Sequence, residues 1–181
     1  MPDFRLESQC WARGLALVAG VDEAGRGPLA GPVVVAAVVL PPHWQPPLPV
    51  DDSKRMSAAA REAAFDVIRR AALAHRILAV PPREIDRVNI LQATLQGMAR
   101  VVRALQPAAH AALVDGNQAP PVDVPCWTVV GGDGLSLSIA AASVLAKVAR
   151  DRIMLAYDRR YPQWGFAAHK GYPTPAHRQA L

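Results

Sequence analysis

An apolar run, 15–21, is followed at once by two carboxylates, Asp22 and Glu23, and then by the turn Gly25-Arg26-Gly27. The run is typical of a buried strand, and a second apolar run, 32–40, predicts a strand that carries the chain away. Two acids at the end of a buried strand have no obvious capping role. Carboxylates beside a basic, glycine-rich turn suit a metal ion and a phosphate-bearing ligand. The segment therefore constrains both the fold and the chemistry.

The remaining apolar patterns alternate between strands and helices. Strands are predicted at 15–22, 32–40, 76–80, 111–115 and 127–130, and helices at 57–75, 89–105 and 138–161. Ser57 and Asn89 are expected to cap the first two helices. This order favours an α/β fold, in which helices flank a mixed sheet. A chain of 181 residues, 51% apolar and 19% charged, is expected to form one domain, 1–181, with a lead-in at 1–14 and a short C-terminal segment from about 162.

Composition bears on the cellular compartment of the chain and on the charge of its partners. The longest apolar run, 32–42, is too short to span a bilayer, and the N-terminus lacks the apolar segment of a signal peptide. Cys10 and Cys126 have no metal-binding spacing, so reduced thiols in the cytoplasm are expected. The net charge of +5, from 20 basic and 15 acidic residues, weakly favours a polyanionic partner.

Carboxylates stand at or just beyond three predicted strand ends, namely Asp22-Glu23, Asp115 and Asp133. Ligands of open α/β sheets gather at the carboxyl ends of strands. Four carboxylates in one crevice would repel one another, and divalent cations would neutralise them. Hard oxygen ligands without cysteine or paired histidine point to Mg²⁺ or Mn²⁺. Two such ions could activate a water and stabilise a leaving oxygen in phosphodiester hydrolysis.

Each acid also has a plainer interpretation. Asp115-Gly116-Asn117 is good turn chemistry, and Asp133 could cap the helix that follows it. Neighbours on a strand face opposite ways, so Asp22 and Glu23 reach one site only if the strand ends or bends there, which Gly25 would permit.

Several further residues are candidates for ligand binding. Gly25-Arg26-Gly27 would let backbone groups read a hydroxyl, or it is a tight turn. Ser143 and Lys147 share a helix face, where they would hold a phosphate unless Lys147 forms a surface pair with Asp151. Tyr172, beside basic residues, would stack on a sugar or base unless it is a core or turn residue.

A basic loop, 52–55, precedes the first predicted helix. The remaining histidines follow no pattern and are expected at the surface: His43, His75, His110 and His177.

Six motifs occur in one order along the chain: Val21 to Pro28, Asp52-Ser53-Lys54, Asn89 to Thr94, Val114 to Asn117, Ser138 to Lys147, and His169 to Tyr172. Together they closely resemble bacterial ribonuclease HII, from about residue 15 to the C-terminus. The resemblance implies the ribonuclease H-like fold, with a five-stranded mixed sheet flanked by helices. It also implies metal-dependent cleavage of RNA in RNA–DNA hybrids and at single ribonucleotides in duplex DNA. Cleavage would fall 5′ to the ribonucleotide, leaving a 3′-hydroxyl and a 5′-phosphate, in ribonucleotide and RNA primer removal.

The resemblance also assigns residues. Asp22, Glu23, Asp115 and Asp133 match the acidic positions that hold two metal ions, Asp22 bridging both. Gly25, Arg26 and Gly27 match the turn that recognises the 2′-hydroxyl, and Tyr172 matches the tyrosine that stacks on the following sugar. Ser143, Lys147 and Lys54 match contacts to substrate phosphates. Relatives often carry lysine where this chain has Gly131 and Ala168.

The implied partner is a hybrid or a ribonucleotide-containing DNA duplex, bound by a cytoplasmic monomer without a membrane. Two alternatives stay open. A DNA-directed nuclease of the same fold, such as a junction resolvase, would use clustered acids without needing the Gly-Arg-Gly turn. A non-catalytic hybrid-binding module would retain the fold without turnover.

Overall fold

The computed structural model describes residues 1–181. One five-stranded sheet is formed by β1 (Val18–Ala24), β2 (Val33–Val39), β3 (Ala74–Val80), β4 (Ala111–Asp115) and β5 (Cys126–Val129), in the order β3-β2-β1-β4-β5. β2 lies antiparallel to both β1 and β3, whereas β4 lies parallel to both β1 and β5. The predicted mixed sheet is confirmed.

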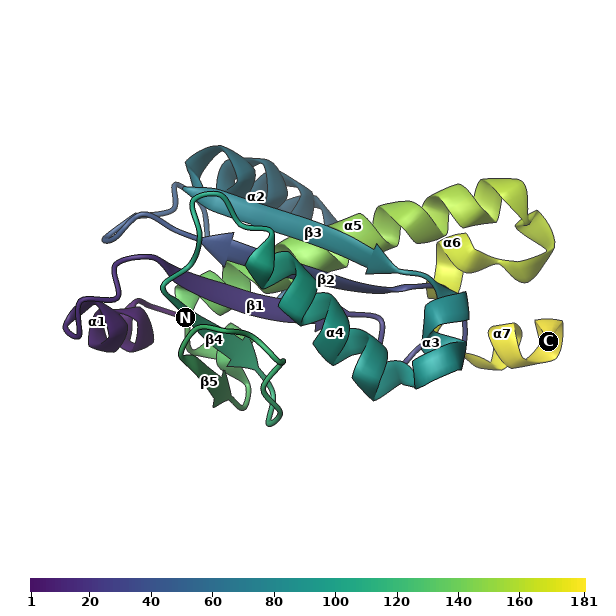
Figure 1. Cartoon of the computed structure of the whole chain (residues 1–181). Coiled ribbons are helices and arrows are strands. Elements are labelled where there is room, and N and C mark those ends of the chain that lie inside the picture. The colour runs from purple at the N-terminus through teal and green to yellow at the C-terminus, as the bar shows by residue number, and fades with distance from the viewer.

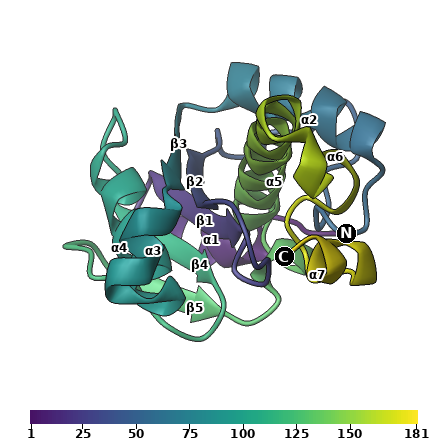
Figure 2. The same ribbon diagram turned by 90° about the vertical axis from the view of Figure 1, so that its right-hand side faces the viewer.

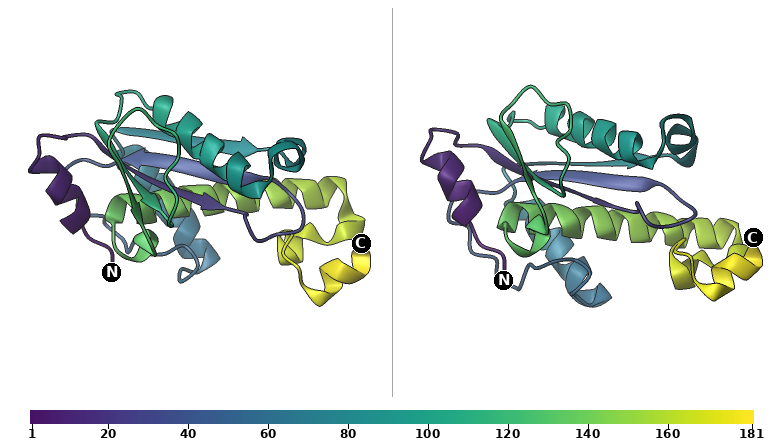
Figure 3. Two further views of the ribbon diagram at one scale, coloured as in Figure 1. Left: turned by 60° about the horizontal axis from the view of Figure 1, so that its bottom comes forward. Right: turned by 90° about the horizontal axis from the view of Figure 1, so that it is seen from below.

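Helices cover both faces of this sheet (Figures 1 and 2). The helices are α1 (Arg5–Trp11), α2 (Ala58–Ala71), α3 (Pro82–Val88), α4 (Ile90–Arg103), α5 (Leu137–Arg160), α6 (Phe166–His169) and α7 (Pro175–Ala180), with single 3₁₀ turns η1 (Gly132–Gly134) and η2 (Pro162–Trp164). α4 packs on one face, and α5 with α2 on the other. Seen from below, α6 and α7 lie beside the C-terminal end of α5 (Figure 3). No helix is long and apolar enough to cross a membrane.

The two predicted caps are confirmed. The Ser57 hydroxyl accepts the Ala60 N–H at 3.2 Å, and Asn89 Oδ1 accepts the Gln92 N–H at 3.0 Å. The short helices α1, α3, α6 and α7 were not predicted, because four to seven residues give too little periodicity to distinguish a helix from a loop.

The position of strand β2 explains why its sequence is an uninterrupted apolar run. All seven of its residues are buried. Val34, Ala36 and Val38 belong to the core shared with α2 and α5, while Val35 and Ala37 belong to the core shared with α4. A strand covered on both faces has no polar side to alternate with its apolar one.

Gly20 sets the distance between α5 and β1. A Cβ on Gly20 would lie 2.0 Å from the carbonyl carbon of Ser138, so the backbone of α5 rests directly on the strand. The alanine-rich start of α5 keeps its side chains short along this contact. The contact falls two residues before Asp22, and it therefore brings α5 against the part of β1 that carries the acids.

Helix α1 ties the N-terminus of the chain to α5. Glu7 is fully buried, and its Oε1 accepts the Ser136 hydroxyl at 2.6 Å and the Ser138 N–H at 2.9 Å. Ser136 in turn caps α5 by accepting the Ile139 N–H at 3.1 Å. Negative charge at the N-terminus of a helix is favourable. Residues 1–14 therefore contribute to the position of α5 and are more than a lead-in.

Candidate active site

The first acids lie where the parallel part of the sheet ends. β1 and β4 run parallel, and their pairing ends at Val21 opposite Val114, so Asp22 and Asp115 follow at the same edge. The prediction that β1 ends at Asp22 is wrong. It continues through Ala24, because residues 22–24 still pair with β2 in the antiparallel ladder.

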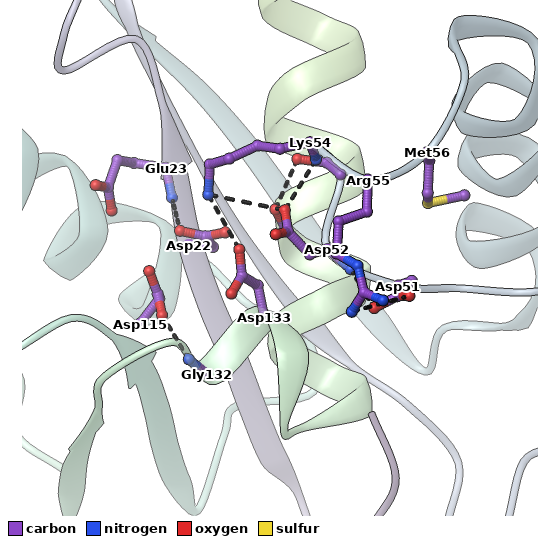
Figure 4. A network of polar contacts seen from close by, with 12 residues as sticks. Asp22, Glu23, Asp51, Asp52, Lys54, Arg55, Met56, Asp115, Gly132 and Asp133 are labelled. Atoms are coloured by element: carbon purple, nitrogen blue, oxygen red, sulfur yellow. Dashed lines mark hydrogen bonds and ion pairs between the residues drawn. The ribbon is translucent and has the colours of Figure 1, made fainter. Parts of the chain in front are cut away.

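Asp22 and Glu23 alternate across β1 as strand neighbours do, and no bend brings them to one side. Asp22 and Glu23 point to different sides of β1 (Figure 4), and Glu23 lines a small hollow with residues of α4. Asp115 lines this small hollow and also a second one, which contains Asp22. The carboxylates therefore meet around the end of the sheet, and Gly25, at φ 106°, turns the chain only after both acids.

Asp133 lies just beyond β5, as expected, in the 3₁₀ turn η1. The cap of α5 is Ser136, so Asp133 does not serve as that cap. The Gly132 N–H donates to Asp115 Oδ1 at 2.7 Å, which ties η1 to the end of β4. This bond brings Asp133 into the acidic group.

The ammonium of Lys54 lies among these acids (Figure 4). Its Nζ is 3.1 Å from Asp133 Oδ2 and 3.8 Å from Asp52 Oδ1. Burial works against its charged form, but the hydrogen bond and attraction of Asp133, followed by Asp52 and Asp22, raise the pKa of Lys54 above its ordinary value. The side chain is still 73% exposed, so it can leave the site without disturbing the core.

Asp22 has the least complete hydrogen bonding of the four acids. Its Oδ1 accepts the Glu23 N–H at 2.7 Å, while Oδ2 is buried and has no hydrogen-bond partner. Burial, and then repulsion by Glu23 and Asp115, raise the pKa of Asp22 well above 3.8. Burial also raises the pKa of Glu23, although Arg26 at 3.4 Å works in the other direction, and it raises the pKa of Asp115. A cation bound among these acids would stabilise their charged forms.

A hollow of about 180 Å³ joins the acids to most of the predicted binding residues. Its lining comprises Asp22, Glu23, Ala24, Gly25, Arg26, Gly27, Ser53, Lys54, Asp115, Lys147 and Tyr172. Of the predicted site residues, only Asp133 and Ser143 do not line it. Asp133 is linked to it by Lys54, and Ser143 is buried beside it, with its hydroxyl 2.9 Å from that of Ser53.

Lys147 forms the predicted pair with Asp151, but not at the surface. Its Nζ lies 2.8 Å from Asp151 Oδ1, and its side chain is only 17% exposed. The same ammonium lies 5.7 Å from the centroid of the Tyr172 ring. Lys147 therefore belongs to the hollow as well as to the ion pair.

Two histidines support the loop of Tyr172. The His177 ring is fully buried and stacks on that of His169 at 4.1 Å between centroids. His177 Nδ1 donates to the Tyr172 carbonyl at 3.0 Å, and the Gly171 N–H donates to His169 Nδ1 at 3.0 Å. The expectation that His177 lies at the surface is wrong, because the chain reversal at 170–174 folds it back under the loop. No local pattern in the sequence could have shown this.

A mixed sheet with carboxylates at the end of its parallel strands, beside a basic turn, defines an α/β enzyme of the ribonuclease H-like class. Residues 19–181 match the family described as ribonuclease HII. The chain is 54% identical to the ribonuclease HII of Dechloromonas aromatica over 167 residues, covering 92% of this chain and 85% of that one. It is 53% identical to that of Syntrophotalea carbinolica over 175 residues, covering 97% and 83%.

Solved structures agree with these relatives. The ribonuclease H2 of Pyrococcus horikoshii has a TM-score of 0.73 at 26% identity, covering 90% of this chain and 83% of that one. The ribonuclease HII of Archaeoglobus fulgidus, solved in a complex with PCNA, has a TM-score of 0.71 at 26% identity, covering 91% and 86%. The chain belongs to the ribonuclease HII family. It is an endoribonuclease that acts on RNA–DNA hybrids.

Proposed function

We propose that this enzyme cleaves both the RNA strand of hybrids and single ribonucleotides embedded in duplex DNA, 5′ to the ribonucleotide, leaving a 3′-hydroxyl and a 5′-phosphate. One observation carries the proposal. A single hollow is lined by three of the acids, by Gly25-Arg26-Gly27 and by Tyr172. The 2′-hydroxyl separates RNA from DNA, so a turn that reads it beside the acids would restrict cleavage to ribonucleotides.

The acids fit divalent cations as ligands. The buried, unpartnered Oδ2 of Asp22 and the all-oxygen donor set suit Mg²⁺ or Mn²⁺. No three acids lie close enough together to hold one ion. The ammonium of Lys54 lies beside Asp133 and Asp52. An ion bound by Asp133 would therefore require Lys54 to move aside. Two bound ions would supply an activated water and stabilise the leaving oxygen. Asp22, Glu23, Asp115 and Asp133 are the proposed ligands.

The other residues of the hollow have proposed roles in binding. Backbone groups of Gly25 and Gly27, with the Arg26 side chain, would contact the 2′-hydroxyl. Tyr172, 39% exposed, would stack on the next sugar. Lys147 and Lys54, together with the hydroxyl of Ser143, would position the phosphates. The proposed setting is a cytoplasmic monomer that removes ribonucleotides and RNA primers.

A cleavage assay on three duplexes tests this function. The substrates are a DNA duplex with one ribonucleotide, a continuous RNA–DNA hybrid and an all-DNA duplex, each with Mg²⁺, Mn²⁺ or EDTA. We expect cleavage of the first two with either metal and none in EDTA. Cleavage of the all-DNA duplex would favour a DNA-directed nuclease, and binding without turnover would favour a hybrid-binding module.

Tyr172→Ala is expected to reduce cleavage at a single ribonucleotide about tenfold and to reduce cleavage of a continuous hybrid much less. Stacking on an aromatic ring contributes about 1–3 kcal/mol, and a lone ribonucleotide offers no neighbouring 2′-hydroxyls to compensate for its loss. The measurement is kcat/KM on both substrates. Tyr161→Ala, which removes an exposed tyrosine from the end of α5, is the control. Equal losses on both substrates would make Tyr172 merely structural.

Lys54→Met is expected to tighten Mn²⁺ binding about two- to fivefold. The ammonium of Lys54 competes with a cation for the same acids, and an exposed ion pair is worth about 0.2–1 kcal/mol. Calorimetric titration of Mn²⁺ measures the change. Arg55→Met is the matched control, because Arg55 pairs with Asp51 away from the site. Weaker binding by Lys54→Met would show that Lys54 assists the ion.

A further inference from the structure

Arg150 is a fully buried cation on α5 without a carboxylate partner. It makes no salt bridge. Its three hydrogen bonds all go to backbone carbonyls: Nε to Pro32 at 3.0 Å, Nη1 to Lys170 at 2.8 Å and Nη2 to Ala30 at 3.1 Å. Burying a charge is costly unless polar partners satisfy it. A guanidinium presents several donors in one rigid plane, so it can hold several carbonyls at once.

The three carbonyls belong to two loops that are far apart in sequence. Those of Ala30 and Pro32 follow the Gly-Arg-Gly turn, and that of Lys170 lies two residues before Tyr172. The same loops meet elsewhere, because the Leu29 N–H donates to the Gly171 carbonyl at 2.9 Å. A Cβ on Gly171 would lie 2.3 Å from the Ala30 carbonyl oxygen, so the two backbones are in direct contact.

Arg150 also touches the two recognition elements themselves. A Cβ on Gly25 would lie 2.2 Å from Arg150 Nε, so the turn packs against the guanidinium. The guanidinium carbon is 5.7 Å from the centroid of the Tyr172 ring. Arg150 thus contacts the turn, the following loop and the tyrosine loop together.

We propose that Arg150 is a positioning residue that fixes Tyr172 relative to the Gly-Arg-Gly turn, and so sets the selectivity for single ribonucleotides. The inference rests on the proposed roles of the turn and of Tyr172. If the two loops shift relative to each other, the ring no longer lies one sugar beyond the 2′-hydroxyl that the turn contacts. Chemistry at the acids does not require the ring, so a continuous hybrid is affected less.

Arg150→Lys tests this, because lysine keeps the charge but carries its three donors on one nitrogen, which cannot reach all the carbonyls that arginine bonds through Nε, Nη1 and Nη2. We expect cleavage at a single ribonucleotide to fall about tenfold while cleavage of a continuous hybrid falls less than about threefold. In a Tyr172→Ala background, Arg150→Lys should add less than about twofold, because two residues acting through one contact are not additive. Arg152→Lys, an exposed residue of the same helix that pairs with Glu62, is the control.

Equal losses on both substrates, or full additivity with Tyr172→Ala, would overturn the inference. If Tyr172→Ala alone leaves the substrate ratio unchanged, it is the proposed role of Tyr172 that fails. If Tyr172→Ala changes the ratio and Arg150→Lys does not, only the role of Arg150 fails. Should Arg150→Lys not fold, Leu29→Pro tests the alignment of the two loops on which the inference depends, because it removes the N–H that joins them at an exposed position. An unchanged substrate ratio in Leu29→Pro would then overturn the inference.

Discussion

Asp22→Asn is expected to abolish cleavage, which means that the single-turnover rate falls about 10³-fold or more. The protein should still bind its duplex. The loss is of the size seen when a catalytic carboxylate is removed. Binding should persist because the turn, Lys147 and Tyr172 are untouched. The measurements are single-turnover cleavage of a duplex with one ribonucleotide and titration of the same duplex by fluorescence anisotropy. Cleavage near the parent rate would contradict the proposed site.

The same substitution is expected to stabilise the protein in EDTA. The pKa of Asp22 is raised above its ordinary 3.8 by burial and by neighbouring acids. The folded state therefore disfavours the charged form, and stability falls as pH rises from 3.8 through the raised pKa. Asparagine keeps an oxygen for the Glu23 N–H and never ionises. The gain should be small below pH 3.8 and complete above the raised pKa, by about 1–3 kcal/mol.

Thermal unfolding between pH 3 and pH 8 separates these two regimes. Asp86→Asn is the control, because Asp86 is an exposed acid of α3 and makes no ion pair. A lower melting temperature for Asp22→Asn at pH 8 would show that the Asp22 carboxylate is well satisfied.

Gly20→Ala is expected to destabilise the protein by about 3 kcal/mol. Adding a methyl group to a closely packed position costs about 1–3 kcal/mol, and here the obstacle is the backbone of Ser138 at 2.0 Å, which cannot rotate away. The methyl group would move α5 away from β1. Ser143 and Lys147 would move with the helix, and misplacement by about 1 Å can cost about 10² in rate.

Urea unfolding and the kcat of the folded variant measure the two effects. Gly134→Ala is the matched control, because nothing lies within 4 Å of the added Cβ and the residue does not have a positive φ. If Gly20→Ala unfolds at the same urea concentration as the parent, the contact between α5 and β1 relaxes easily and does not fix the site.

Sequence patterns were sufficient for the parts of the molecule that depend on periodicity and short motifs. The five strands, the three long helices and the caps at Ser57 and Asn89 follow from local composition. The motifs also identified nine residues that line one hollow. The strands, helices and caps were predictable because each depends on neighbours within one turn or one strand. The nine site residues come from separate elements, and it was the resemblance of six ordered motifs to a known family that brought them together.

The parts that could not be predicted depend on how distant segments meet. β1 continues past Asp22 because β2 pairs with it, and the sequence of β1 contains no signal for this pairing. Asp133 reaches the acids through a bond from η1 to Asp115, and His177 is buried by a chain reversal. Arg150 sits one helical turn after Lys147, but only the fold shows that carbonyls of two loops surround it.

The attachment of Arg150 to residues on both sides of it in sequence has a consequence for synthesis and degradation of the chain. Its partners lie at Ala30 and at Lys170, so the turn and the tyrosine loop are joined only after residue 170 has been made. Contacts of such sequence separation carry a loop-closure cost that slows folding. A nascent chain, or a fragment cut within α5, would carry the acids without the loop that selects ribonucleotides. Selection of ribonucleotides therefore depends on a contact between segments far apart in the sequence, whereas Asp22, Glu23, Asp115 and Asp133 all precede the end of α5.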